Sequence, residues 1–156
     1  MEKRSVILAY NSIKDPRDMA EILHLAAGFG AEVHLLGKSL KPSHWKVLRK
    51  LRSWRPIFSE KPEEIPARSF PDARVWIRDA QARGFMVVAT VLEGGIRPRL
   101  DASCKRIAIL FGEETHGLPA DLIGECNGRW TLPLGAGGRF YTLGQTTAVI
   151  LGAVGL

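Results

Sequence analysis

The chain contains only two cysteines, Cys104 and Cys126, among its 156 residues. Neither cysteine lies at a spacing from other cysteines or histidines that protein metal sites use. The sequence therefore predicts no bound metal. Such sparse cysteine usage is typical of a reducing compartment, so we expect free thiols and a cytoplasmic setting.

Long apolar runs are also missing, because no stretch approaches the length that a membrane-spanning helix needs. Residues 1–4 lead directly into a short strand-like run, which is not the pattern of a secretory signal peptide. The sequence has no internal repeat and no low-complexity segment. No G-x-G-x-x-G motif follows the first strand-like run, which disfavours a nicotinamide-binding Rossmann enzyme. We expect neither a membrane association nor a repeat protein.

Basic residues, in contrast, are in excess: Lys and Arg number 22 against 16 Asp and Glu, a formal net charge of +6. This excess of positive charge favours a polyanionic partner, and RNA is the first candidate. A hydrophobic content of 46% and a charged content of 24% are typical of a folded protein. The length fits a single domain over residues 1–156.

Strand-like and helix-like segments alternate along the chain. Residues 4–10 and 31–37 read as buried strands. Between them lies a predicted helix with Asp15 as its N-cap, Pro16 at its first position and Gly30 at its end. A strand–helix–strand unit of about 35 residues implies parallel pairing of its strands.

The alternation continues to the C-terminus. Further helices are predicted over residues 41–55 and 71–84, and further strands over 85–91 and 107–111, while the proline-rich stretch 56–71 is predicted to be irregular. The sequence therefore predicts an α/β fold with a mostly parallel sheet flanked by helices.

The C-terminal stretch contains several ligand-type turns in close succession. The strand over 107–111 ends at Gly112, and a predicted strand over 129–134 is followed by the glycine-rich loop 135–138 and a helix of small residues. Glycine-rich turns that feed a helix expose backbone N–H groups to a ligand. We therefore predict a binding pocket at this end of the chain.

Short motifs in this stretch occur in the order G-E-E, G-L, L-P-L and T-L-G-Q-T-T-A, and the segment D-M-A-E-I-L-H with F-G lies near the N-terminus. These motifs resemble the SpoU/TrmH branch of the SPOUT class of RNA methyltransferases. That branch carries G-N-E, G-L, I-P-M-like and S-L-N-V-S-V-A motifs, and an N-terminal N-x-G-x-x-x-R motif followed by F-G. The resemblance extends over nearly the whole chain, and between residues 38 and 84 it is limited to the strand–helix rhythm.

The resemblance implies a C-terminal trefoil knot and a homodimer in which the N-terminal motif helix of one protomer completes the site of its partner. It also implies S-adenosylmethionine as cofactor, held by three loops. The residues at the matching positions are Thr90, Leu92, Gly94, Gly112, Glu113, Leu132, Leu134, Leu143 and Gly144.

The usual reaction of this branch is methylation of a ribose 2′-hydroxyl in transfer or ribosomal RNA. By this resemblance, His24, Glu114 and Thr142 are the catalytic candidates. His24 stands where the branch has its arginine, and a histidine near neutral pH can serve as a base. A solvent-facing histidine and a helix-capping glutamate would produce the same pattern.

A basic helix is the main candidate for RNA contact. Trp45 and Trp54 lie between its positive charges, a combination that suits both phosphate attraction and base stacking, although a solvated basic face over a core would look the same. Outside this helix, Arg17 and Arg139 are further candidates. The candidates on the helix are Lys46, Arg49, Lys50 and Arg52.

The sequence therefore predicts an S-adenosylmethionine-dependent RNA methyltransferase, acting at a ribose 2′-oxygen. Two alternatives stay open. One is a non-catalytic knotted RNA-binding or assembly protein, because Asp18, Glu113 and Gly144 replace asparagines of the branch. The other is an RNA base methyltransferase on the same fold.

Overall fold

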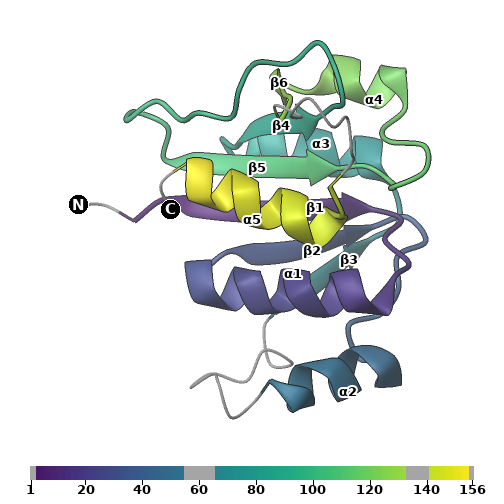
Figure 1. Ribbon diagram of the computed structural model, residues 1–156. Coiled ribbons are helices and arrows are strands. Elements are labelled where there is room, and N and C mark those ends of the chain that lie inside the picture. The colour runs from purple at the N-terminus through teal and green to yellow at the C-terminus, as the bar shows by residue number, and fades with distance from the viewer. Residues whose placement is uncertain (1–2, 55–65, 133–140, 155–156) are drawn as a thin grey trace.

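The computed structural model describes residues 3–54, 66–132 and 141–154. These residues form six strands and five helices (Figure 1). The strands are β1 (Ser5–Asn11), β2 (Glu32–Leu36), β3 (Ala67–Phe70), β4 (Met86–Thr90), β5 (Arg106–Phe111) and β6 (Gly128–Trp130). The helices are α1 (Pro16–Phe29), α2 (Trp45–Ser53), α3 (Ala73–Ala82), α4 (Ala120–Glu125) and α5 (Leu143–Ala153).

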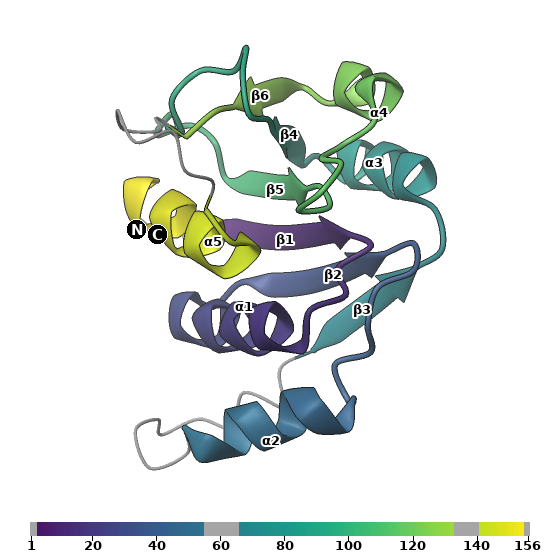
Figure 2. The same cartoon turned by 45° about the vertical axis from the view of Figure 1, so that its right-hand side comes forward.

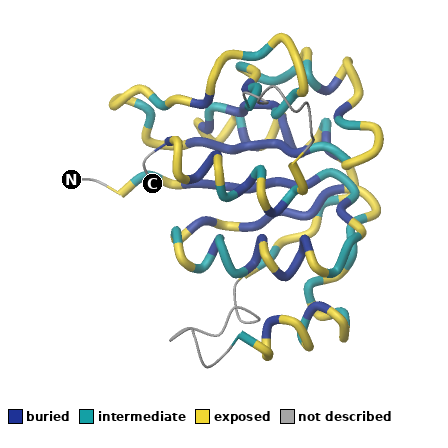
Figure 3. The backbone as a smooth tube through the Cα atoms, in the orientation of Figure 1, coloured by how far each residue is buried: buried dark blue, intermediate teal, exposed yellow. Residues whose placement is uncertain are grey.

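The six strands form one sheet in the order β3-β2-β1-β5-β4-β6, and every neighbouring pair is parallel. Helices α1 and α5 cover one face and α3 covers the other, while α2 packs on the outer side of α1 (Figure 2). The strands at the centre of the sheet are buried along most of their length (Figure 3). The predicted α/β fold with a parallel sheet flanked by helices is confirmed.

Local signals determine the ends of α1 as the sequence predicted. The Asp15 side chain accepts a hydrogen bond from the Arg17 backbone N–H at 2.8 Å, and Pro16 occupies the first turn, where no intrahelical donor is lost. Gly30 ends the helix in the left-handed conformation. One face of α1 buries Met19, Ile22 and other apolar side chains against the sheet.

The expectation of irregular structure over 56–71 is wrong for β3. Residues Ala67–Phe70 pair in parallel with β2, from Val33 opposite Ala67 to Leu36 opposite Phe70. This strand lies at the sheet edge and its residues are only half-buried or exposed. An edge strand of this kind needs no buried apolar run, so the sequence pattern did not indicate it.

Other predicted boundaries also differ. The helix predicted from residue 41 begins at Trp45, because His44 accepts a hydrogen bond from the Lys46 N–H and caps it. The strand predicted over 129–134 covers Gly128–Trp130. Residues 133–140, with Leu134 and Arg139, lie outside the described residues. The trefoil knot depends on the path of this segment and stays a prediction.

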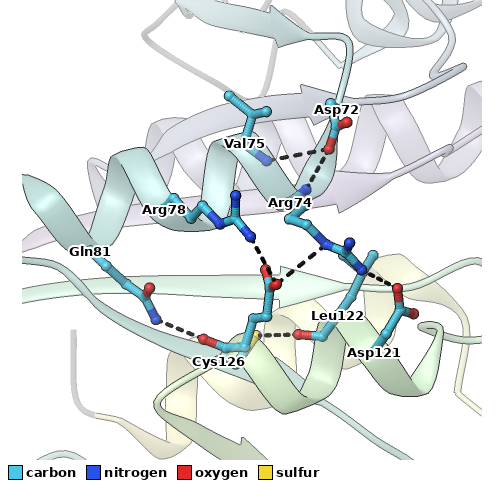
Figure 4. Close-up of polar contacts among 9 residues, drawn as sticks. Asp72, Arg74, Val75, Arg78, Gln81, Asp121, Leu122 and Cys126 are labelled. Atoms are coloured by element: carbon cyan, nitrogen blue, oxygen red, sulfur yellow. Dashed lines mark hydrogen bonds and ion pairs between the residues drawn. The ribbon is translucent and has the colours of Figure 1, made fainter.

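An ion-pair network joins α4, a helix of six residues, to α3 (Figure 4). Arg74 pairs with Asp121 and with Glu125, and Arg78 Nη2 lies 3.4 Å from Glu125 Oε1. Gln81 donates a hydrogen bond of 2.8 Å to the Glu125 carbonyl. Helix α4 has no side-chain N-cap, and these contacts join it to α3.

A buried histidine connects the sheet to α3. The His34 Nδ1 atom accepts a hydrogen bond from Trp76 Nε1 at 2.9 Å, and its Nε2 atom lies 3.1 Å from Glu32 Oε2. Burial lowers the pKa of His34 below its ordinary value of 6.5, although the hydrogen bond to Glu32 opposes this shift. The Trp76 contact requires an unprotonated Nδ1, which agrees with the lowered pKa.

Acidification should therefore destabilise the fold through His34. Below pH 6.5 the unfolded chain binds a proton at this histidine more tightly than the folded chain does, so stability is lost as the pH falls through that value. The measurement is the urea midpoint of the wild type and of His34→Gln at pH 7.5 and pH 5.5. The variant should lose less stability on acidification, and an equal loss would contradict the assignment.

The part of the chain that the structure describes contains no helix that is both long and apolar enough to cross a membrane. Over the same residues, Cys104 and Cys126 are free thiols, and no group of three or more His, Cys, Asp or Glu residues could hold a metal ion.

Candidate functional site

A pocket of about 340 Å³ opens at the carboxyl ends of β4, β5 and β6. Parallel strands bring the loops that follow them to one edge of the sheet, and such edges are common ligand sites in α/β proteins. The loops after β4 and β5 and the first turns of α5 form the walls. The lining includes Thr90, Leu92, Glu113, Glu114, His116, Ile123, Trp130, Leu132, Leu143 and Thr146.

The pocket is apolar on one side and polar on the other. Ile123 of α4, Trp130 of β6 and Leu143 of α5 contribute apolar surface, whereas Glu113 and Glu114 bring carboxylates from the loop after β5. The volume lies within the range of small-molecule sites, and the mixture of an apolar wall with a few polar groups is their usual composition.

The loop after β5 folds back tightly on itself. The Gly117 N–H donates to the Glu113 carbonyl at 2.8 Å. A Cβ atom at Gly112 would collide with the Gly117 backbone and lie 2.6 Å from the Leu118 backbone nitrogen. Gly112 is therefore required for the close approach that gives the pocket its shape.

The N-terminus of α5 meets carboxylates from two other segments. Thr142 caps this helix in a reciprocal capping box with Gln145. The Leu143 N–H lies 3.5 Å from Glu114 Oε1, and the Gly144 N–H lies 3.4 Å from Asp18 Oδ1. A helix N-terminus stabilises negative charge. The two carboxyl groups that meet the start of α5 lie beside the pocket.

Asp18 is the most unusual group of this region, because only 5% of its surface is exposed. Burial, a hydrogen bond to Glu114 and the charge of Glu114 raise the pKa of Asp18 to about 7, while the Gly144 N–H opposes the rise. Its position on α1 aims it at the first turn of α5, across the interface between these helices.

Gly144 has a close neighbour of its own. A Cβ atom at this position would collide with the Glu21 carboxylate of α1. The glycine that replaces the asparagine of the family motif therefore leaves space that Glu21 fills. Glu21 becomes a third carboxylate at the start of α5.

Most of the predicted cofactor residues come together in the pocket. Gly94 lies in the loop after β4 but does not line the pocket, and Thr142 and Gly144 lie beside it at the start of α5. Leu134 lies outside the described residues. The predicted residues that line the pocket are Thr90, Leu92, Gly112, Glu113, Glu114, Leu132 and Leu143.

His24 does not line the pocket of its own chain. Its ring lies 5.6 Å from the Trp54 ring, centroid to centroid, between α1 and the end of α2. Burial lowers the pKa of His24, although the charge of Glu21 opposes this. Any catalytic role of His24 would therefore need the pocket of a second protomer.

Sequence reasoning missed the apolar wall and the buried carboxyl group. Ile123, Trp130 and Thr146 reach the pocket through tertiary contacts that no local motif indicates. Asp18 was matched to the asparagine of a motif but not chosen as a site residue, and the acidic replacement itself was the available signal.

The predicted basic helix is exposed on its charged side. The Trp45 side chain is 60% exposed, with Lys46 Nζ 5.5 Å and the Arg49 guanidinium carbon 5.6 Å from its ring centroid. Lys50 lies in the same way over Trp54, at 5.3 Å. Lys46, Arg49, Lys50 and Arg52 are all exposed, as is Arg17 of α1, whereas Arg139 lies outside the described residues.

A shallow hollow of about 430 Å³ continues this basic surface toward the loops after β1 and β2. Lys14, Lys38 and Lys41 line it together with His44 at the start of α2. None of these three lysines forms an ion pair with another described residue. The basic surface therefore extends from α2 toward the sheet edge that also carries the pocket.

Comparison with known proteins identifies a family that matches this chain. The profile of the SpoU rRNA Methylase family matches residues 5–152. No curated protein sequence matches the chain.

Solved structures share the fold. An rRNA methyltransferase from Sinorhizobium meliloti has a TM-score of 0.81 and 26% identity over 96% of this chain and 55% of that one. Its AdoMet-bound form has a TM-score of 0.82 and 25% identity with the same coverage. A third structure, which concerns the 2-OH methylation of C/U34 on tRNA, has a TM-score of 0.74 and 19% identity over 94% and 91% of the two chains. The chain thus spans about half the length of the Sinorhizobium protein. Because the family profile covers nearly all of the present chain, this chain belongs to the SpoU rRNA Methylase family.

Proposed function

We propose that the protein is an S-adenosylmethionine-dependent RNA methyltransferase that acts at a ribose 2′-oxygen of transfer or ribosomal RNA. The observation that carries the proposal is the pocket at the carboxyl ends of β4, β5 and β6, in the fold of an AdoMet-bound rRNA methyltransferase. The 2′-oxygen is favoured by the neighbour that concerns 2-OH methylation on tRNA.

The pocket residues fit this cofactor. Apolar side chains such as Leu132 and Trp130 suit the adenine ring, and the carboxylates of Glu113 and Glu114 suit a cationic ligand. The tight turn at Gly112 brings backbone without a side chain to the pocket wall.

S-adenosylmethionine supplies an activated methyl group when it is bound. The chain must then orient a ribose hydroxyl and help it to lose its proton, because a hydroxyl is a weak acid. Glu114 lies in the pocket wall and can accept a hydrogen bond from this hydroxyl. Thr142 orders the start of α5 beside it.

His24 acts in the pocket of a partner protomer in this proposal, since it does not line the pocket of its own chain and its ring lies beside Trp54. The active form is then a homodimer of single-domain chains, 1–156. RNA is held by the exposed cations of α2 and by Lys14, Lys38 and Lys41, which continue toward the pocket edge.

The first test is calorimetric titration of S-adenosylmethionine into wild type and a pocket variant. In Thr146→Trp, the indole should fill the pocket from α5 and weaken binding at least tenfold. Val149→Trp is the matched control, because Val149 lies on the same helix, is 43% exposed and does not line the pocket. Wild-type affinity in Thr146→Trp would contradict the assigned pocket.

Two outcomes would favour the alternatives. A folded chain that binds RNA but neither S-adenosylmethionine nor its product would be a non-catalytic RNA-binding protein. If a digest of the product nucleosides shows the transferred methyl group on a base, base methylation would replace the ribose assignment.

A further inference from the structure

Asp18 and Glu114 form a pair of carboxyl groups at the start of α5. Asp18 comes from α1 and Glu114 from the loop after β5. Their carboxyl oxygens approach the N–H groups of two consecutive residues, Gly144 at 3.4 Å and Leu143 at 3.5 Å, and this brings the two carboxyl groups into contact. Two ionised carboxylates have no proton to donate, so this contact requires that the pair hold one proton. The pair therefore carries one negative charge when protonated and two after that proton leaves.

The surroundings of the pair decide when the proton leaves. Backbone N–H groups of Leu143 and Gly144 favour the charged form of the two carboxyl groups. Among the described residues, no lysine or arginine forms an ion pair with either one. The other titratable groups that face this region are Asp15 and Glu21 on α1, Tyr10 on β1, and Glu113 and His116 in the loop after β5.

The two members of the pair differ in exposure, because Asp18 is buried and Glu114 is exposed to solvent. Glu114 lines the pocket, whereas Asp18 lies behind it with 5% of its surface exposed. Charge added at Asp18 is screened less than charge on an exposed carboxylate, because protein and not water surrounds it.

We propose that Asp18 is a positioning residue that acts through Glu114, and that the proton shared by this pair sets how strongly the pocket prefers the cationic methyl donor over its neutral product. This inference rests on the proposed function. S-adenosylmethionine carries a positive charge on its sulfonium sulfur, whereas the thioether sulfur of S-adenosylhomocysteine is uncharged. A second negative charge on the pair therefore strengthens the binding of S-adenosylmethionine more than that of S-adenosylhomocysteine.

The direction of the pH effect follows from the raised pKa of Asp18, about 7. Below this value the pair keeps its proton and discriminates weakly. Above it the second charge is present, so affinity for the sulfonium rises relative to the thioether. For charges roughly 10 Å apart in a partly solvated site, one added charge corresponds to about a fivefold change in the affinity ratio.

The test is calorimetric titration of both ligands at pH 6.0 and pH 8.0, with the ratio of their dissociation constants as the readout. In wild type, the preference for S-adenosylmethionine should rise about fivefold between these values. In Asp18→Asn the amide still donates to Glu114 but cannot titrate, so this rise should disappear. Ionisation of the ligands is common to both proteins and cancels in the comparison.

Asp15→Asn is the matched control. It removes one negative charge from the same end of α1, and asparagine caps a helix as well as aspartate, so the pH-dependent preference should persist. Circular dichroism and thermal melting verify folding of each variant. If Asp18→Asn does not fold, Glu114→Gln, at an exposed position, should abolish the rise in the same way.

The outcomes separate this inference from the function on which it rests. Binding of both ligands with the same pH-dependent ratio in wild type and Asp18→Asn would overturn the role of Asp18 and leave the cofactor assignment intact. A ratio that does not change with pH in wild type would do the same. Absence of binding by either ligand to the folded wild type would overturn both proposals.

Discussion

Replacing Gly112 with alanine is expected to destabilise the protein by roughly 3 kcal/mol and to abolish binding in the pocket. A Cβ atom at this position collides with the backbone of Gly117 and lies 2.6 Å from the Leu118 nitrogen. Backbone cannot rotate away as a flexible side chain can, so the loop after β5 must shift. This loop carries Glu113 and Glu114, and both line the pocket.

The measurements are thermal melting and calorimetric titration of S-adenosylmethionine. Melting should fall by about 6–12 °C for a chain of this size. Gly152→Ala is the matched control, because Gly152 lies in α5 with open space around it, and alanine favours a helix interior by roughly 0.5–1 kcal/mol. Unchanged melting and binding in Gly112→Ala would show that the loop accommodates the methyl group.

The fold was predictable wherever its signals are local. The ends of α1 follow from Asp15, Pro16 and Gly30, which act within one turn of the helix. The buried strands follow from apolar runs such as Ile107 to Phe111. Strand β3 escaped because pairing with β2, and not its own pattern, makes it a strand. Edge strands of four residues carry too little buried surface to leave a periodic signal.

The site was predictable only in part, for the same reason. Residues directly after β4 and β5, such as Thr90 and Gly112, follow from the rule that ligands bind at the carboxyl ends of parallel strands. The wall from α4 depends on the ion pairs of Arg74 and Arg78, which join segments more than 40 residues apart. The contact between Asp18 and Gly144 spans 126 residues. Such distances in sequence carry no periodicity, so tertiary structure alone reveals them.

Removing the positive charge of α2 is expected to weaken RNA binding about 100-fold or more at 0.1 M salt. The fourfold variant replaces Lys46, Arg49, Lys50 and Arg52 by glutamine, which keeps helix propensity and leaves the buried Val47 and Leu51 untouched. Each lost phosphate contact to single-stranded RNA lowers the salt dependence of log K by about 0.7, so the slope should fall by about 3.

Fluorescence anisotropy with a labelled RNA, measured from 0.05 to 0.3 M salt, gives both the affinity and the slope. Arg83→Gln with Lys105→Gln is the control, since both side chains are exposed and these residues precede β4 and β5, at the end of the strands opposite the pocket. If RNA binding reflected only the net charge of +6, the loss per removed charge would be equal in the two variants. A larger loss per charge on α2, with a reduced slope, would instead identify a phosphate-binding surface. In that case the cation–π contacts of Trp45 hold Lys46 and Arg49 at the surface where phosphates approach.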